Sequence, residues 1–112
     1  MTPYSPYRSA GSLVAFSGQN GQRDGALVPG GFVEELRQAL ANLGTLIEDA
    51  GLTRADVFKT TVFLADIADW GRLNEPYVEF FGSPLPARTA LAVASLPRGA
   101  RVEIEAWALR PR

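Results

Sequence analysis

The chain has 112 residues, 46% of them apolar and 21% charged, which predicts a single globular domain spanning residues 1–112. It contains no cysteine and no histidine, which excludes disulfides, thiolate-bound metals, a cysteine nucleophile and a Ser-His-Asp triad. The 11 basic and 12 acidic residues give a net charge of -1 and form no basic run, which disfavours a nucleic-acid partner.

Nothing in the sequence suggests a membrane or an export route. The longest apolar run, residues 90–94, is far too short to cross a bilayer, and the first residues do not resemble a secretory signal. We therefore expect a cytoplasmic protein without a membrane partner.

The first 30 residues alternate short apolar runs with turn formers. Residues 13–17 are predicted to form a strand that ends at Gly18. Residues 20–25 include the hairpin-type turn signal Asp-Gly, and residues 26–28 are predicted to form a brief return strand.

Apolar residues recur three or four positions apart from Phe32 to Ala50, which is typical of one face of an amphipathic helix. Glu34 and Glu35 lie near the start of this helix, where its dipole favours negative charge. Gly51 is predicted to end it, because glycine readily adopts the left-handed conformation common at helix C-termini.

A strand and a second helix are predicted next. Residues 57–64 are dense in β-branched and aromatic side chains with apolar residues on both faces, which indicates a central strand. Asp66 is a candidate cap for the following segment. Residues 70–81 keep helical spacing, but Pro76 lacks an N–H, so we expect the helix to kink there or to begin near Asn74.

Two more strands, residues 88–93 and 101–109, complete the chain. In the last strand Val102, Ile104 and alternate alanines face one way, towards the helices, while Glu103, Glu105, Trp107 and Leu109 face the other. Exposing a sheet face that carries Trp and Leu to water is unfavourable, so we expect this face to contact another subunit.

The predicted order is β-β-α-β-α-β-β. Two helices packed on one face of a mixed sheet satisfy this order, so the predicted fold class is α+β, a two-layer sandwich.

Five short segments also occur in an order shared with a known family: Thr2-Pro3-Tyr4-Ser5, Ser17-Gly18-Gln19, residues 59–64, residues 86–90 (Pro-Ala-Arg-Thr-Ala) and residues 102–106 (Val-Glu-Ile-Glu-Ala). Over nearly the whole chain the sequence resembles the RidA/YjgF family of reactive-intermediate deaminases, once described as translation inhibitors and ribonucleases.

The resemblance implies a chorismate-mutase-like fold and a homotrimer with active sites in the clefts between subunits. It implies hydrolysis of 2-iminopropanoate and 2-iminobutanoate, which leak from pyridoxal-phosphate enzymes, to 2-keto acids and ammonia. It implies no cofactor and no metal in this chain.

The resemblance also assigns roles to individual residues. Arg88 matches the arginine that holds the substrate carboxylate, and Glu103 matches the glutamate that positions the attacking water. The positions matched to substrate binding are Tyr4, Ser17, Asn74, Thr89 and Ala90. Ala90 stands where many members have cysteine, which implies a contribution through the backbone. Pro76 and Pro6-Tyr7 depart from the family pattern and put the pocket shape in doubt.

The residue types fit this chemistry, although each has an ordinary structural alternative. The guanidinium of Arg88 can bind a carboxylate in a bidentate way, or it can form a surface ion pair. Glu103 and Glu105 share a face, and either could orient water or make an interface salt bridge; the motif register favours Glu103. Without histidine, Glu103 or water would also deliver the proton to the leaving nitrogen.

Several other polar residues carry weaker hypotheses. Ser17 has no base partner, so it should form hydrogen bonds rather than act as a nucleophile. Asn74 could equally be a helix cap. Lys59 could form a Schiff base, but a solvated strand lysine is the simpler interpretation. The aromatic residues of the second helix are most simply core.

Two other functions remain open at this stage. The same cleft could bind a 2-keto acid or another small carboxylate and regulate a partner without turnover. The chain could act on RNA as a ribonuclease or translation inhibitor, although it lacks both histidine and a basic stripe.

Overall fold

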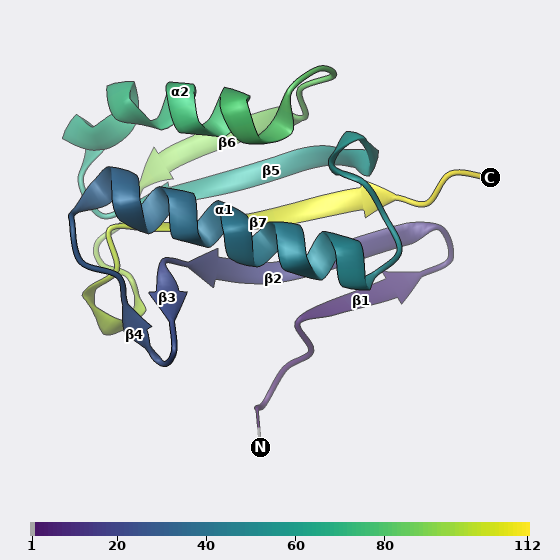
Figure 1. Ribbon diagram of the computed structural model, residues 1–112, viewed down its shortest axis with the longest axis horizontal. Coiled ribbons are helices and arrows are strands. Elements are labelled where there is room, and N and C mark those ends of the chain that lie inside the picture. The colour runs from purple at the N-terminus through teal and green to yellow at the C-terminus, as the bar shows by residue number, and fades with distance from the viewer. Residues whose placement is uncertain (1) are drawn as a thin grey trace.

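A computed structural model describes residues 2–112, in which a five-stranded sheet has strand order β1-β2-β7-β5-β6 (Figure 1). The strands pair antiparallel except β5 and β6, which are parallel because α2 connects them as a crossover. The bounds of these strands are β1 Tyr7–Ala10, β2 Leu13–Asn20, β5 Val57–Leu64, β6 Ala87–Ala92 and β7 Val102–Leu109.

Both helices, α1 (Phe32–Asp49) and α2 (Trp70–Phe81), lie over the same face of this sheet (Figure 1). The core lies between the two layers and contains the apolar face of α1 and the alternate residues Val102, Ile104, Ala106 and Ala108 of β7. The predicted α+β two-layer sandwich and the order β-β-α-β-α-β-β of the main sheet are therefore confirmed, as is the two-faced pattern of β7.

The identity of the first two strands differs from the prediction. The pair that opens the main sheet is β1 and β2, joined by a tight turn, and β1 was not predicted. The predicted return strand at residues 26–28 forms β4 (Ala26–Leu27), which pairs only with β3 (Gln22–Arg23) in a separate two-stranded ribbon. Three of the four positions of β1 are exposed and its two apolar residues, Tyr7 and Ala10, do not alternate with polar ones, so the sequence of this edge strand carries no strand pattern.

The C-terminus of α1 follows the predicted glycine geometry. Gly51 has a φ of 75°, and its N–H donates to the carbonyl of Glu48 while the Leu52 N–H donates to that of Ile47. These two bonds form a Schellman motif, which satisfies carbonyls that the helix leaves free.

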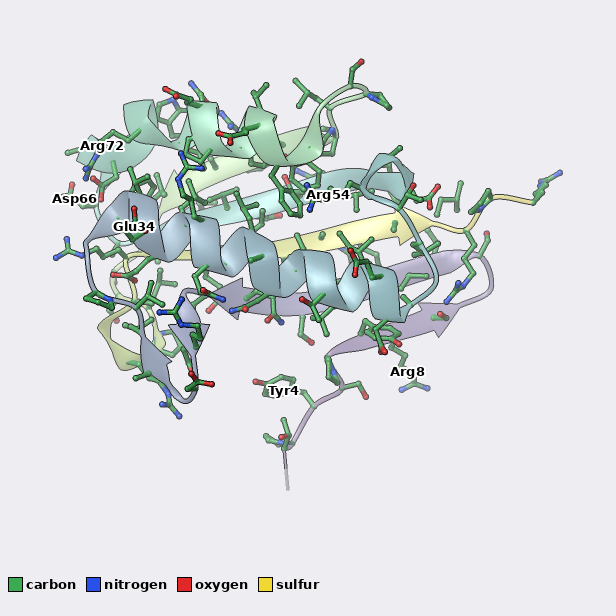
Figure 2. The ribbon with its side chains drawn as sticks, in the orientation of Figure 1. Tyr4, Arg8, Glu34, Arg54, Asp66 and Arg72 are labelled. Carbon is green, nitrogen blue, oxygen red and sulfur yellow. The ribbon has the colours of Figure 1, made fainter. Side chains whose placement is uncertain are left out.

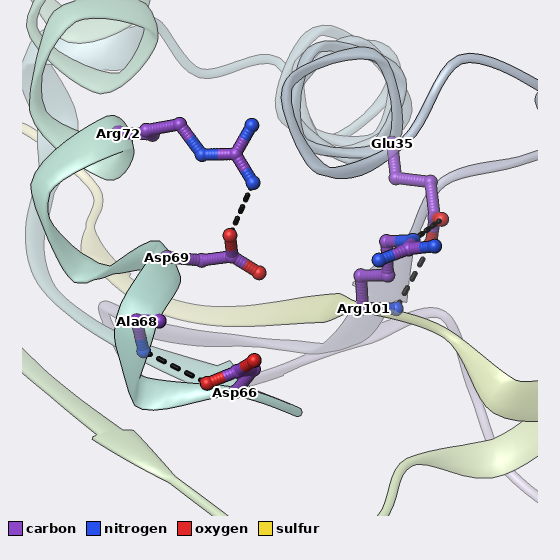
Figure 3. Close-up of polar contacts among 6 residues, drawn as sticks. All are labelled: Glu35, Asp66, Ala68, Asp69, Arg72 and Arg101. Atoms are coloured by element: carbon purple, nitrogen blue, oxygen red, sulfur yellow. Dashed lines mark hydrogen bonds and ion pairs between the residues drawn. The ribbon is translucent and has the colours of Figure 1, made fainter.

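The expectation that α2 would begin near Asn74 is wrong, since the helix begins at Trp70 and continues through Pro76. A 3-10 turn, Ile67–Asp69, leads into it, and Asp66 accepts a 2.9 Å bond from the Ala68 N–H, as its capping role predicted (Figure 3). Pro76 is buried with Leu73 and Tyr77, so packing against the core offsets the missing hydrogen bond.

Two buried carboxylates, Glu35 and Asp69, form ion pairs, and the pair made by Glu35 links α1 to the start of β7 (Figure 3). Glu35 of α1 is 5% exposed and accepts a 2.9 Å bond from the Arg101 N–H, just before β7, while its other oxygen lies 3.4 Å from the Arg101 Nε. Asp69 pairs with Arg72 in the first turn of α2. Within residues 2–112, no helix is both long and apolar enough to span a bilayer.

Candidate functional site

Arg88 lies on the edge strand β6 and points towards the helices. Its Cα pairs with that of Thr60 in β5, which is fully buried beneath the helical layer. An arginine at an interior position of a sheet would be buried, but β6 is an edge strand, so the Arg88 side chain stays half-buried. The edge position of β6 therefore places the charged guanidinium of Arg88 at the boundary between the core and solvent.

Three residues of α2 surround the Arg88 guanidinium. The Arg88 Nη2 donates a 2.8 Å hydrogen bond to the Asn74 Oδ1. The guanidinium carbon lies 4.9 Å from the centre of the Tyr77 ring and 5.9 Å from that of Trp70. These residues lie at i, i+4 and i+7, so they share one face of the helix. Among residues 2–112 no carboxylate pairs with Arg88, which leaves its charge free for an external anion.

The other two residues assigned to β6 lie on different faces of the sheet. Thr89 lies on the face away from the helices, where its hydroxyl accepts a 2.6 Å bond from the Lys59 Nζ. Ala90 points back and packs against the core. Because β6 is an edge strand and consecutive residues direct their backbone N–H and C=O to opposite sides, one of these two residues has backbone groups that no neighbouring strand pairs.

Glu103 lies in β7 on the face away from the helices, beside the glycine of the Ser-Gly-Gln segment. A β-bulge between Phe16 and Gln19 shifts the β2–β7 register at this point. A Cβ added to Gly18 would lie 2.9 Å from the Glu103 Cδ, so only glycine leaves room for the carboxylate as it is placed. Glu103 lines a hollow of about 340 Å³ together with Tyr4, Gly18 and Asn42.

Burial raises the pKa of the Glu103 carboxyl above its ordinary value, and the negative charge of Glu105 raises that pKa further. A carboxylate with a raised pKa is a stronger base than an ordinary one. Its position therefore suits a group that holds and partly deprotonates a water molecule.

Ser17 binds the backbone of the N-terminal segment that carries Tyr4. The Ser17 hydroxyl donates a 2.7 Å bond to the Ser5 carbonyl, and the Ser17 N–H donates a 2.9 Å bond to that of Pro6. These bonds fasten the N-terminal segment that leads into β1 and carries Tyr4, a residue that is 62% exposed (Figure 2). Tyr4 lines the Glu103 hollow and also a second hollow of about 420 Å³ beside Ser17, Glu105 and Trp107.

The structure thus divides the predicted site into two groups that do not meet within one chain. We call Asn74, Arg88 and the backbone of residues 89–90 the arginine group, and Tyr4, Ser17 and Glu103 the glutamate group. Strand β5 separates β6 from β7, which is two strand spacings or roughly 10 Å, and Arg88 and Glu103 point to opposite faces. Glu103 is also aligned with Phe63, three residues along β5 from the partner of Arg88.

Sequence reasoning missed the second role of two α2 aromatics. Tyr77 belongs to the core, as expected, but Trp70 is 41% exposed and both rings face the Arg88 guanidinium. The spacing of Trp70 and Tyr77 from Asn74 could have predicted this, because it places all three residues on one face of the helix. No group of three acidic side chains within residues 2–112 is arranged to hold a metal ion.

A family model described as Endoribonuclease L-PSP matches residues 1–110. The 2-iminobutanoate/2-iminopropanoate deaminase of Mus musculus is 51% identical over 110 residues, covering 96% of this chain and 82% of that protein. The chain belongs to the RidA/YjgF family. The resemblance inferred from five short segments is therefore confirmed.

Solved structures of the family share the whole fold. RidA from an Antarctic Psychrobacter bacterium matches with a TM-score of 0.92 at 37% identity, covering 96% of this chain and 89% of that one. TdcF of E. coli, solved with bound serine, matches with a TM-score of 0.92 at 34% identity, covering 99% of this chain and 91% of that one.

Proposed function

We propose that this protein hydrolyses 2-imino acids such as 2-iminobutanoate and 2-iminopropanoate to 2-keto acids and ammonia. Water adds to the imine carbon to give a carbinolamine, and the C–N bond then breaks as a carbonyl forms and the nitrogen leaves as ammonia. The proposal is supported by the name of the mouse relative, a 2-iminobutanoate/2-iminopropanoate deaminase, and by the chemistry of the two groups of residues.

The observation that carries the proposal is the open guanidinium of Arg88. It is held by Asn74 and two aromatic rings and has no carboxylate partner among residues 2–112. A positioned guanidinium of this kind binds the carboxylate common to 2-imino and 2-keto acids. The serine bound to TdcF is likewise a small carboxylate, which fits a clamp of this type in the family.

Glu103 supplies the second half of the chemistry. We assign it to hold the attacking water, accept its proton, and return a proton to the leaving nitrogen. A protonated imine is already electrophilic, so the water needs placement and partial deprotonation more than a strong base. Tyr4 borders the same hollow, and the N-terminal segment that carries it is held in place by Ser17.

We further propose that the working enzyme is a homotrimer whose sites form between subunits. The arginine group and the glutamate group then come from adjacent copies of the chain. The sheet face away from the helices supports this assembly, because it exposes large apolar side chains at 40% or more: Leu13, Phe58, Leu91, Trp107 and Leu109. The expected compartment is the cytoplasm, and the scattered cations disfavour a nucleic-acid partner.

The test of the reaction couples the protein to a dehydratase that releases 2-iminobutanoate and follows decay of the imine. We expect wild type to accelerate the decay and Arg88→Ala to lower kcat/KM by about 10-fold to 100-fold, since a charge-assisted bond contributes roughly 1.5–3 kcal/mol. Arg37→Ala, which removes an exposed surface ion pair with Glu79, should leave kcat/KM unchanged.

Two results would contradict the proposal. If Arg88→Ala and wild type accelerate imine decay equally, Arg88 does not hold the substrate. If wild type binds 2-oxobutanoate but does not hydrolyse the imine, the protein is a small-carboxylate binding protein and the hydrolytic assignment is wrong.

A further inference from the structure

Tyr77 touches both partners of one strand pairing. Thr60 of β5 and Arg88 of β6 are paired in register, and Tyr77 of α2 lies over them both. Its hydroxyl shares a 2.6 Å hydrogen bond with the Thr60 hydroxyl, and its ring lies 4.9 Å from the Arg88 guanidinium carbon. One side chain therefore links a central strand, an edge strand and the helix that covers them.

The Tyr77 ring cannot easily turn away from this position. Tyr77 is 3% exposed, and its ring packs on that of Phe81 with 4.8 Å between their centres. Its hydroxyl partner Thr60 is fully buried and has no access to water. Burial also raises the pKa of the Tyr77 phenol, which keeps the ring neutral beside the guanidinium.

We propose that Tyr77 is a positioning residue for the Arg88 carboxylate clamp, an inference that rests on the proposed function. The ring supports one face of the guanidinium, and Asn74 accepts a hydrogen bond from one of its nitrogens. The remaining N–H groups of Arg88 make no hydrogen bond within residues 2–112 and stay available to a bound carboxylate.

Positioning matters here because arginine has a long, flexible side chain. An exposed arginine loses rotamer freedom when it binds an anion, whereas one already held by a ring and an amide loses less. The gain appears in substrate affinity, because the clamp contacts the carboxylate equally before and during the reaction. Loss of the ring should therefore raise KM and leave kcat nearly unchanged.

The test compares three variants on the same helix. Tyr77→Leu removes the ring, and Tyr77→Phe keeps the ring but removes the bond to Thr60. Phe80→Leu is the matched control, because Phe80 carries a different arginine, Arg54, whose guanidinium carbon lies 3.9 Å from its ring centre. Circular dichroism and the mass of the assembly check that each variant folds as wild type does.

We expect Tyr77→Leu to raise the KM for 2-iminobutanoate about fivefold, with kcat within about twofold of wild type. Tyr77→Phe and Phe80→Leu should have KM values close to that of wild type. An unchanged KM in Tyr77→Leu overturns the proposal while the proposed function stands. An equal rise in Phe80→Leu also overturns it, since the effect would then come from helix packing.

Two further measurements test the positioning role of Tyr77 independently of the proposed hydrolytic function. If wild type shows no turnover, the affinity for 2-oxobutanoate is measured by calorimetry: a fivefold loss in Tyr77→Leu supports the positioning role without catalysis, and no binding by wild type overturns both proposals. If Tyr77→Leu does not fold, the Arg88 side-chain protons of wild type are examined by nuclear magnetic resonance. An upfield ring-current shift supports the stacked geometry, and its absence overturns it.

Discussion

At the scale of single residues, the two carboxylates of β7 differ in their surroundings although they lie on the same face. Glu103 is half-buried beside Gly18, whereas Glu105 borders the hollow formed by Ser17 and Trp107. Burial is the larger cause of the raised Glu103 pKa, and the charge of Glu105 is the smaller one. The two effects can be separated because a substitution at Glu105 removes only the second.

We expect Glu105→Gln to lower the pKa of Glu103, because the neutral amide no longer disfavours a negative charge nearby. If the carboxylate form of Glu103 is the active one, activity is lost as pH falls through this pKa. The acid limb of the kcat/KM profile should therefore move to lower pH in Glu105→Gln. The measurement is kcat/KM against pH, with Glu34→Gln as a control on an exposed acid of α1.

A limb that stays in place, or moves to higher pH, would show that Glu103 is not the group that titrates. Glu103→Gln provides the complementary result, since loss of a general base typically lowers the rate by about 100-fold or more. The limb should be absent from whatever activity that variant retains.

At the scale of elements, the N-terminal segment depends on Ser17 for its place beside the sheet. The Ser17 hydroxyl donates a hydrogen bond to the Ser5 carbonyl, and the Ser17 backbone N–H donates one to the Pro6 carbonyl. The serine that sequence reasoning assigned to substrate binding therefore also fastens the segment that carries Tyr4, just before β1. Its hydroxyl proton is used within the chain.

We expect Ser17→Ala to loosen residues 2–5 without unfolding β1, because the backbone bond to Pro6 remains. The change in the free energy of unfolding should be about 1 kcal/mol or less, the usual contribution of one neutral hydrogen bond. Faster amide hydrogen exchange in residues 2–5, with a rise in KM, would be the expected result. Ser12→Ala, in the β1–β2 turn, is the control, and equal exchange in both variants would contradict the role.

How much of this fold the sequence predicts depends on how each element is buried. The apolar period of α1 and the alternation of β7 predict their faces correctly, because each packs on the core along one side. The exposed edge strand β1 carries no such pattern and was missed. Pro76 led to a wrong start for α2 because local propensity says nothing of the packing of Leu73 and Tyr77.

The candidate site follows the same logic. Motif order predicts site roles for Arg88 and Glu103, and alternation places Glu103 on the face away from the helices. Alternation cannot show that Arg88 contacts Asn74 and Tyr77, because that contact joins a strand edge to a helix. Nor can it show that Ser17 bonds the backbone of Ser5, since that depends on where the N-terminal segment lies.

At the scale of the whole molecule, the proposed function requires two copies of the chain if Arg88 and Glu103 serve one substrate. Arg88 lies in the edge strand β6 and points to the helical face of the sheet. Glu103 lies in β7, on the other side of β5, and points to the opposite face. No side-chain rotation brings them to one small substrate. A second copy, related by the rotation of a closed ring, can bring its glutamate group to the arginine group of the first.

This arrangement predicts that two inactive variants restore each other. Arg88→Ala and Glu103→Gln should each have little activity alone, because every site lacks one of its two groups. When the two are refolded together in equal amounts, random assembly gives about a quarter of the sites an intact arginine from one chain and an intact glutamate from its neighbour. Imine hydrolysis should then recover to about a quarter of the wild-type rate.

The control is the double variant, with both substitutions in one chain, mixed with wild type. This mixture contains the same four kinds of site (both groups intact, one of the two, or neither), so its activity should also be about a quarter of that of undiluted wild type if sites span two chains. If each site lies within one chain, the double-variant mixture should instead keep about half of the activity, and the two single variants should restore nothing. Those two results together would place the site within one subunit and contradict the shared-site proposal, whatever mass the assembly has.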